Sequence, residues 1–232
     1  MFAGPKPESR TARHNNPMDR NNLETRWRLL WNRLGAAAPP EGVYTRLIAA
    51  WNERHRRYHT LEHLRECLEW FDVVEPLAQT PALLELAIWF HDAVYQPGDE
   101  NNELRSAYLA ERALAAAGCS RDTAGDVRRM ILATRLKGRP ETADEKLLLD
   151  IDHSVLGADP LRFDRYDEGI RVEYAHIPGP AYIVARRQVL RGFHDRYRIY
   201  HTDYFYEQLE KQARVNLTRA LKRLRPLHRL GV

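Results

Sequence analysis

The sequence predicts an all-α protein built as a single irregular multi-helix domain. Apolar residues recur at helical spacing almost without a break from Leu23 onward. Runs of alternating β-branched residues, which are typical of strands, are nearly absent. Glycine and proline separate the apolar segments at positions where these residues end or begin helices. The segments differ too much in length for a simple four-helix bundle.

The first half of the chain carries clear signals for helix boundaries. Gly35 and the Ala-Pro-Pro turn that follows it end the first helix. Thr60 is in position to cap the third helix. Thr80 and Pro81 give an N-cap followed by proline at the first helical position, which predicts the start of another helix. The Gln-Pro-Gly-Asp sequence at 96–99 ends that helix.

The second half of the chain is delimited in the same way. Gly118 is a natural residue to follow a helix end, and Ser120 begins the next helix. Thr142 caps a further helix, and Pro160 and Pro180 each open another. The predicted helices are, in order, residues 23–34, 41–56, 61–77, 81–95, 100–117, 120–134, 142–157, 160–176, 180–196 and 203–225.

The chain divides into one helical domain and two tails. Residues 1–22 are rich in Pro, Asn, Arg and Ser and carry almost no large apolar side chains, which predicts a disordered N-terminal tail. Residues 23–225 form the predicted helical domain. Residues 226–232 form a short C-terminal tail.

Charge and hydropathy narrow the class of protein. Lys and Arg number 36 and Asp and Glu 32, and the resulting net charge of +4 is too small to indicate a nucleic-acid-binding protein. The basic residues of the last predicted helix are typical of a solvated helix face, so nucleic acid is not the expected partner. No apolar run approaches ~18 residues, and the first residues lack an apolar signal core. We therefore expect a cytoplasmic protein with no membrane partner.

Four segments carry the residue types that do chemistry. YHTLEH at 58–63 places two histidines four positions apart on one helical face. WFHD at 89–92 holds an adjacent His-Asp pair near the end of an apolar helix. LLLDID at 147–152 places two acids within a strongly apolar run. The polar segment NNE at 101–103 follows the loop after the His-Asp pair.

Helical phase separates the two acids of the apolar run. Leu148, Ile151 and Val155 define a buried stripe on the predicted helix. At 100° per residue from Leu148, Asp152 falls about 40° away and Asp150 about 200° away. Asp152 is therefore predicted to face the core, where an unpaired carboxylate is costly and needs a cation. Asp150 is predicted to be solvated.

Imidazole and carboxylate groups together suit a divalent cation such as Zn²⁺, Mn²⁺, Fe²⁺ or Mg²⁺. Cys67 and Cys119 show neither the spacing of a metal-binding motif nor a disulfide framework, so the histidines and acids are the candidate ligands. Three or four ligands from separate helices would leave positions open for water and a substrate. A metal needs this arrangement to turn water into a nucleophile.

The order of His63, then His91-Asp92, then Asp152 on successive helices resembles the HD superfamily of metal-dependent phosphohydrolases, an all-helical family. It resembles more closely a bacterial branch of HD phosphohydrolases. The resemblance covers roughly residues 23–225. The chain departs from it at His153, where an apolar residue is expected. The matching segments are RRYHTLEHL (56–64), AIWFHDAVY (87–95), NNELRSA (101–107), LLLDIDHSVLG (147–157), GIRVEY (169–174) and EKQARVNL (210–217).

This resemblance implies a hydrolase that cleaves a phosphate ester, with a nucleotide or a related small metabolite as substrate. It implies a divalent ion held by His63, His91, Asp92 and Asp152. Asp92 could bridge to a second, more weakly held ion. The metal would polarise the phosphoryl oxygen and lower the pKa of its bound water from ~15.7 towards ~7.

YHTLEH also resembles the Tyr-His-Asn-x-x-His signature of cyclic nucleotide phosphodiesterases, in which the second histidine binds metal and the first protonates the leaving oxygen. His63 would then be a metal ligand and His59 a general acid, a role that typically contributes ~10²–10⁴-fold in rate. Other HD hydrolases would instead make His59 the ligand. We favour His63 as the ligand and keep both assignments open.

The implied reaction needs groups that bind the phosphate oxygens. A guanidinium fork matches phosphate geometry, and Arg171 is the first choice, followed by Arg135 and Arg186. Glu103 is expected to orient a ligand histidine or a metal-bound water rather than to act as a base.

Two other functions remain open at this point. An HD scaffold can also hold a di-iron centre that activates oxygen, which would make the protein an oxygenase. A regulator that binds a nucleotide without catalysis is the second alternative, although such a pocket need not keep four metal ligands. The sequence also leaves open the substrate, the metal and a homo-oligomeric state.

Overall fold

The computed structural model describes residues 22–135 and 138–224, and every regular element within these ranges is helical. The all-α prediction is therefore confirmed. No helix in the same two ranges is both long and apolar enough to cross a bilayer. The elements are α2 (Leu23–Arg33), α3 (Val43–Trp51), α4 (Leu61–Val74), η1 (Glu75–Leu77), α5 (Pro81–Phe90), α6 (Asn102–Ala116), α7 (Arg121–Ala133), α8 (Ala143–Asp152), η2 (His153–Gly157), α9 (Pro160–Glu173), α10 (Gly179–His194) and α11 (Asp203–Arg223).

The helix starts lie close to the predicted positions, and several capping residues act as expected, whereas the Thr80 hydroxyl makes no capping hydrogen bond to α5 and donates to Asp144 instead. Ser120 caps α7, and Thr142 caps α8 through a reciprocal capping box. Asn22, which the sequence analysis assigns to the N-terminal tail, accepts hydrogen bonds from two backbone N–H groups and caps α2. The rest of the two predicted tails, 1–21 and 226–232, lies outside the described residues.

Several helices end earlier than predicted, by five residues at α3, α5 and α8, which end at Trp51, Phe90 and Asp152. For α5, the buried guanidinium of Arg56 provides the physical reason. It donates to the carbonyl oxygens of Asp92 and Ala93 at 2.8 and 3.4 Å, and these carbonyls therefore need no helical N–H partner. The chain leaves the helix at this point, so Asp92 lies in a turn instead of a continued helix.

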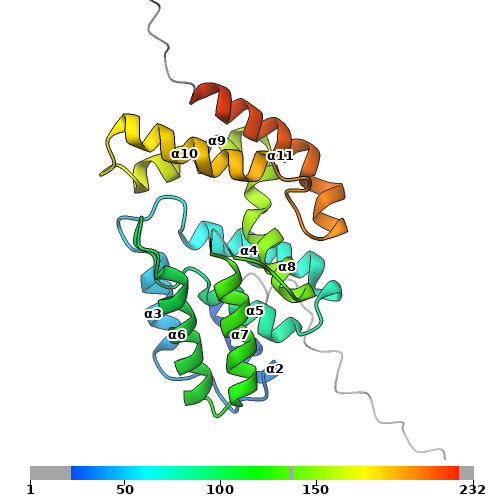
Figure 1. Ribbon diagram of the computed structural model, residues 1–232. Coiled ribbons are helices and arrows are strands. Elements are labelled where there is room, and N and C mark those ends of the chain that lie inside the picture. Colours follow the sequence, from blue (N-terminus) through cyan, green and yellow to red (C-terminus); the bar gives the residue numbers. More distant parts are fainter. Residues whose placement is uncertain (1–21, 136–137, 225–232) are drawn as a thin grey trace, which may run out of the picture.

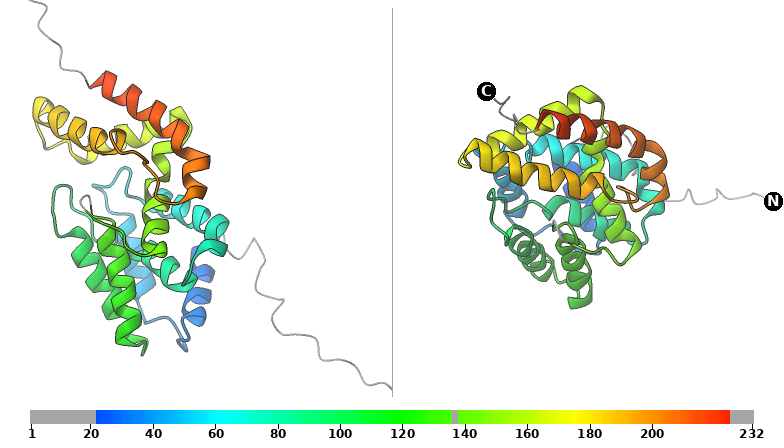
Figure 2. Two further views of the ribbon diagram at one scale, coloured as in Figure 1. Left: turned by 45° about the vertical axis from the view of Figure 1, so that its right-hand side comes forward. Right: turned by 45° about the horizontal axis from the view of Figure 1, so that its top comes forward.

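The helices are arranged in two layers, as Figures 1 and 2 show. Helices α2 to α8 form the larger layer, and α9, α10 and α11 lie over one end of it. Helix α5 occupies the centre of the larger layer and packs against α2, α4, α6, α7 and α8. Its residues from Leu84 to Phe90 are all buried, as expected of a helix that is apolar all round. The short η2 contacts α8, α9 and α11 and so joins the two layers.

Aromatic side chains fill the core behind the candidate histidines. Trp27 packs edge to face on Trp31 and Trp89, with ring centroids 5.3 and 5.2 Å apart. Trp51 donates its indole N–H to the backbone carbonyl of Trp89 at 3.2 Å. The ring of Trp51 also lies 5.5 Å from the imidazole of His91. The tryptophan cluster therefore forms a rigid wall against which His91 is held.

The prediction that Asp150 is solvated is wrong, because the residue is only 1% exposed. Its carboxylate accepts hydrogen bonds from the backbone N–H groups of His201 and Thr202, at 2.8 and 2.7 Å, and from the Thr202 hydroxyl at 2.7 Å. The error has a physical cause. Helix α8 packs against α4, α5 and α7, and the segment that precedes α11 covers its other side. A helix with two buried faces cannot be oriented from a single apolar stripe.

We therefore expect Asp150→Ala to lower the free energy of unfolding by about 1–3 kcal/mol, because it leaves the buried donors around residues 201 and 202 without an acceptor. Urea unfolding followed by circular dichroism measures the change. Asp195→Asn is the matched control, since that carboxylate is 70% exposed and should change stability by no more than about 0.5 kcal/mol. Equal effects of the two variants would contradict the assigned role of Asp150.

Candidate metal centre

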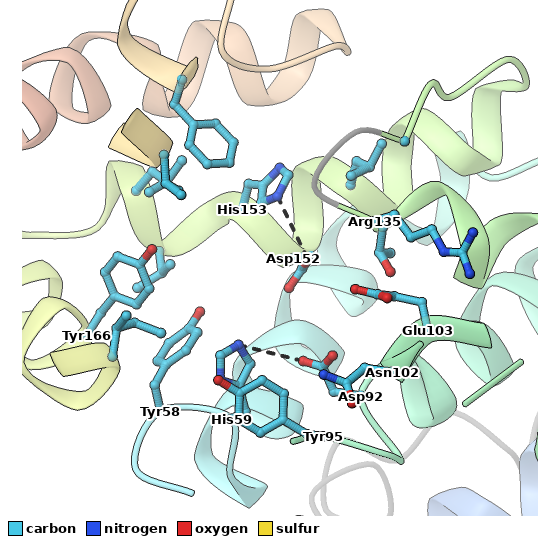
Figure 3. Close-up of a pocket in the computed structure, with 18 of the residues that line it drawn as sticks. Tyr58, His59, Asp92, Tyr95, Asn102, Glu103, Arg135, Asp152, His153 and Tyr166 are labelled. Carbon is cyan, nitrogen blue, oxygen red and sulfur yellow. Dashed lines mark ion pairs between the residues drawn. The ribbon is translucent and has the colours of Figure 1, made fainter. Parts of the chain in front are cut away.

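A large pocket lies between the two layers, with a volume of about 900 Å³. Its walls come from the segments around the starts of α4 and α6, the turn after α5, the segment after α7, the junction of α8 with η2, and the inner faces of α9 and α10. Figure 3 shows the labelled side chains of this pocket. Among them, His59, Asp92, Asp152 and Glu103 are residues that the sequence analysis singled out.

His63, His91 and Asp152 converge at the edge of the pocket, and we call them the metal cluster: Asp152 lines the pocket, and the two histidines lie buried behind it. Each comes from a different helix: His63 from the first turn of α4, His91 from the end of α5 and Asp152 from the end of α8. The two histidine Nε2 atoms are 3.3 Å apart. Asp152 Oδ1 lies 3.2 Å from Nε2 of His63 and 3.6 Å from Nε2 of His91. Both histidines are almost fully buried.

The hydrogen bond at the other ring nitrogen of His91 fixes its tautomer. Nδ1 of His91 lies 2.9 Å from the carbonyl oxygen of Ile88, and a carbonyl only accepts, so Nδ1 carries a proton. Nε2 is then left facing Asp152 and the imidazole of His63. Burial disfavours the imidazolium, but the neighbouring carboxylates outweigh it and raise the pKa of His91 well above its ordinary value. The cluster thus attracts positive charge.

The distances within the metal cluster fit a divalent cation. Metal–ligand bonds of about 2.1 Å in tetrahedral geometry place neighbouring ligand atoms about 3.4 Å apart. The donor atoms of the cluster are 3.2 to 3.6 Å apart. Burial alone raises the pKa of Asp152, but hydrogen bonds with His63 and His91 reverse this and lower it well below its ordinary value. A charged carboxylate and two imidazoles therefore meet where a cation can replace the shared proton.

Asp92 lies on the pocket side of His91. Its Oδ2 atom is 3.3 Å from Nε2 of His91, which is also the spacing of two ligands on one ion. Burial raises the pKa of Asp92, but His91 and His59 outweigh this and lower it. Figure 3 shows Asp92 and Asp152 close to each other, with their carboxylates turned towards the space between them. Asp92 therefore stands where a cation in the cluster would meet a substrate.

Cys67 belongs to the same group of donors, although the sequence analysis set it aside. Its sulfur and donor atoms of His63, His91 and Asp152 all lie within 4.8 Å of one another. The sulfur is 3.7 Å from both ring nitrogens of His63, so it lies beside the ring and off the lone-pair direction of Nε2. Burial raises the pKa of the Cys67 thiol well above its ordinary value. The sequence does hold a signal for this contact: Cys67 follows His63 by four residues, and residues at this spacing lie on the same face of a helix.

His59 lies outside the metal cluster. Its Nδ1 is 2.8 Å from Oε2 of Glu173, and its Nε2 faces Oδ2 of Asp92 at 3.9 Å. The imidazole also stacks on the ring of Tyr95, with centroids 4.0 Å apart. In this geometry His63 is the histidine that meets His91 and Asp152, whereas His59 faces Asp92, as Figure 3 shows.

Glu173 organises this side of the pocket, and the sequence analysis gave it no role. The buried carboxylate accepts hydrogen bonds from His59, from the Tyr95 hydroxyl at 2.8 Å and from the backbone N–H groups of residues 57 to 59. Burial disfavours its charged form, but these donors outweigh burial and lower the pKa of Glu173 to about 2. Its position three residues after the buried Ile170 on α9 is the only local signal of an inward-facing acid.

Glu103 and two of the three candidate arginines, Arg135 and Arg186, line the pocket. Glu103 and Arg135 line the pocket, and Figure 3 places the Glu103 carboxylate near Asp92. Burial, with a contribution from Asp92, raises the pKa of Glu103. Arg186 also lines the pocket, but it is paired with Asp167 at 2.9 Å.

Arg171, the first choice for binding phosphate, requires a correction. It is not among the residues that line the pocket. Its guanidinium donates to the carbonyl oxygen of Tyr174 at 2.9 Å and lies 4.5 Å from the ring centroid of Tyr182. These contacts hold the side chain outside the pocket lining, and the contact with Tyr182, which joins α9 and α10, is not visible in the sequence.

No protein-family model, curated protein or solved structure matches this chain. The interpretation of the site therefore rests on its geometry. The helical fold and the cluster of two histidines, a cysteine and an aspartate are compatible with an HD-type metal-binding domain.

We expect the purified protein to bind about one equivalent of a divalent transition metal, as a histidine and carboxylate site does. Elemental analysis after loading with Mn²⁺, Co²⁺ or Zn²⁺ measures it. His91→Ala, Asp92→Ala and Asp152→Asn should each lower the metal content, whereas Cys67→Ala should retain it because the sulfur lies off the lone-pair direction of its neighbour. His176→Ala, an exposed histidine outside the pocket, is the control. Metal content unchanged in both His91→Ala and Asp152→Asn would rule out this centre.

Proposed function

We propose that this protein is a metal-dependent phosphohydrolase that acts on a small phosphate ester, such as a nucleotide or a related phosphorylated metabolite. One observation carries the proposal. Two buried imidazoles meet the carboxylates of Asp92 and Asp152, which line a pocket of about 900 Å³, and a third histidine, His59, is bound to a glutamate and faces the same pocket. The resemblance of these segments to HD phosphohydrolases directs the choice of a phosphate ester as the substrate.

The proposed cation would be held by His63, His91, Asp92 and Asp152. When bound, a divalent ion supplies Lewis-acid polarisation of a phosphoryl oxygen and lowers the pKa of water towards neutrality. The residues themselves supply the orientation. The Ile88 carbonyl fixes the tautomer of His91, and the tryptophan wall behind it limits movement of the ring.

His59 is the proposed proton donor to the leaving oxygen. Its Nδ1–H group donates to Glu173, so the Nε2 atom is the one available to the substrate. Glu173 also holds the backbone on which His59 stands, through its contacts with the N–H groups of residues 57 to 59. The imidazole is thus oriented before the substrate arrives, as general acid catalysis requires.

The remaining pocket wall fits the organic part of a phosphorylated metabolite. Tyr58, Tyr166, Ile170 and Tyr182 give this wall a largely aromatic surface. Arg135 and Glu103 line another part of the pocket, and among the described residues no carboxylate lies within ion-pair distance of the Arg135 guanidinium. A planar, partly apolar group that carries a phosphate matches both surfaces.

A phosphate-release screen tests the proposed function. The panel comprises aryl phosphates, nucleoside monophosphates, cyclic nucleotides, dinucleotides and nucleoside polyphosphates, each assayed with Mn²⁺, Mg²⁺, Co²⁺ or Zn²⁺. We expect hydrolysis of at least one class that EDTA abolishes and added metal restores. Asp152→Asn should lose activity and metal together, whereas His59→Ala should lose about 10²–10⁴-fold in kcat while it keeps its metal.

The control for this screen is His176→Ala, which should retain full activity. Two outcomes would contradict the proposal: no phosphate release from any ester by the metal-loaded protein, or release that Asp152→Asn does not affect. Oxygen consumption by the iron-loaded protein, without hydrolysis, would favour the oxygenase alternative instead.

A further inference from the structure

The pocket extends beyond the metal cluster to a second region, which we call the distal end and define by Phe193, Arg196 and His201. His153 connects the two regions. Its Nε2 is 3.8 Å from Oδ2 of Asp152, and its ring packs edge to face on Phe193 with centroids 4.8 Å apart. The guanidinium carbon of Arg196 lies 4.6 Å from the centroid of the same phenyl ring. An imidazole and a phenyl ring therefore connect Arg196 to the metal cluster.

The loop between α10 and α11, which carries Arg196 and His201, is held by buried or partly buried charged groups. Glu210 accepts hydrogen bonds from two backbone N–H groups of the loop. Asp150 accepts the N–H of His201 at 2.8 Å, and Arg214 donates to the carbonyl oxygen of Arg196 at 2.7 Å. The backbone at the distal end is thus fixed on both sides. A ligand that binds there does not have to pay for ordering the loop.

Arg196 differs from its neighbours in having no acidic partner. Arg198 in the same loop pairs with Asp203 at 2.9 Å, and Arg186 on the neighbouring pocket wall pairs with Asp167 at 2.9 Å. Among the described residues, no carboxylate lies within ion-pair distance of Arg196. Burial lowers the pKa of its guanidinium, and no acid opposes this effect. A partly buried cation that faces a pocket without a counter-charge is suited to an anion supplied from outside the chain.

We propose that the distal end binds a second phosphate group of the substrate, so that the preferred substrates carry two separated phosphates. The inference rests on the proposed function for the first phosphate, which lies at the metal cluster. Arg196 is connected to the metal cluster through the contacts of Phe193 and His153, so we assign it to a different phosphate from the one at the cluster. A guanidinium fork with an imidazole beside it provides the donors that a phosphate monoester accepts.

Isothermal titration calorimetry with two nucleotides tests the proposal. The probes are adenosine 5′-monophosphate and adenosine 3′,5′-bisphosphate. They are titrated into full-length His59→Ala protein loaded with Mn²⁺, because this variant is expected to keep the metal that binds the first phosphate and to turn over slowly. Arg196→Gln and Arg191→Gln are made in the same background. We expect the bisphosphate to bind about tenfold more tightly than the monophosphate, as one charge-assisted contact allows. Arg196→Gln should reduce this ratio to less than about twofold and leave the affinity for the monophosphate unchanged. Arg191→Gln, an exposed arginine on the same side of the molecule that does not line the pocket, should keep the tenfold ratio.

Three results would overturn the proposal: equal affinities of the Mn²⁺-loaded His59→Ala protein for the two probes, a ratio that Arg196→Gln leaves unchanged, or an equal loss of affinity for both probes when Arg196→Gln is added. Thermal melting of both variants verifies that they are folded. The measurement needs no catalysis, so it separates the two proposals. Failure of every ester in the hydrolysis screen with an intact bisphosphate preference would overturn the proposed function alone, and the reverse combination would overturn the distal site alone.

Discussion

The arrangement of the pocket depends on one electrostatic constraint. Two imidazoles and an aspartate from three different helices meet with their donor atoms 3.2 to 3.6 Å apart in the buried interior. Such groups repel or leave lone pairs unsatisfied unless a proton or a cation lies between them. The folded chain holds them together nonetheless, through the Ile88 carbonyl, the tryptophan wall and the central position of α5. Favourable packing elsewhere in the fold therefore offsets the cost of bringing these groups together, and the resulting site attracts positive charge.

A second feature recurs throughout the fold: buried carboxylates hold loops and helix starts. Each accepts at least two backbone N–H groups from another segment, which lies 50 or more residues away for three of the acids and 10 or 11 residues away for Glu210. Such bonds fix a loop more firmly than packing alone. These acids are Asp144, Asp150, Glu173 and Glu210. Two of these acids serve the two proposed phosphate sites. Glu173 positions His59, and Asp150 positions the loop of the distal end. The pocket is therefore preorganised by groups that do not themselves touch the proposed substrate.

Much of this fold was predictable from local sequence, since caps such as Ser120 and Thr142 act within one turn of a helix. Helical phase also placed Asp152 correctly on the side of the core. The same argument failed for Asp150, because α8 is buried on two faces and the second face is created by a segment about fifty residues later. Glu173 was missed and Arg171 was misassigned for the same reason: their partners come from other elements, and only the tertiary structure brings them together.

Anomalous diffraction from crystals grown with Mn²⁺ tests the central claim most directly. The account predicts one dominant anomalous peak at roughly 2.0–2.2 Å from the Nε2 atoms of His63 and His91 and from a carboxylate oxygen of Asp152, with Asp92 on its pocket side. Absence of a peak at this position, with the two imidazoles and the carboxylate still hydrogen-bonded to one another, would contradict it. The cluster would then be a buried ion pair, and metal-dependent hydrolysis at this site would be excluded.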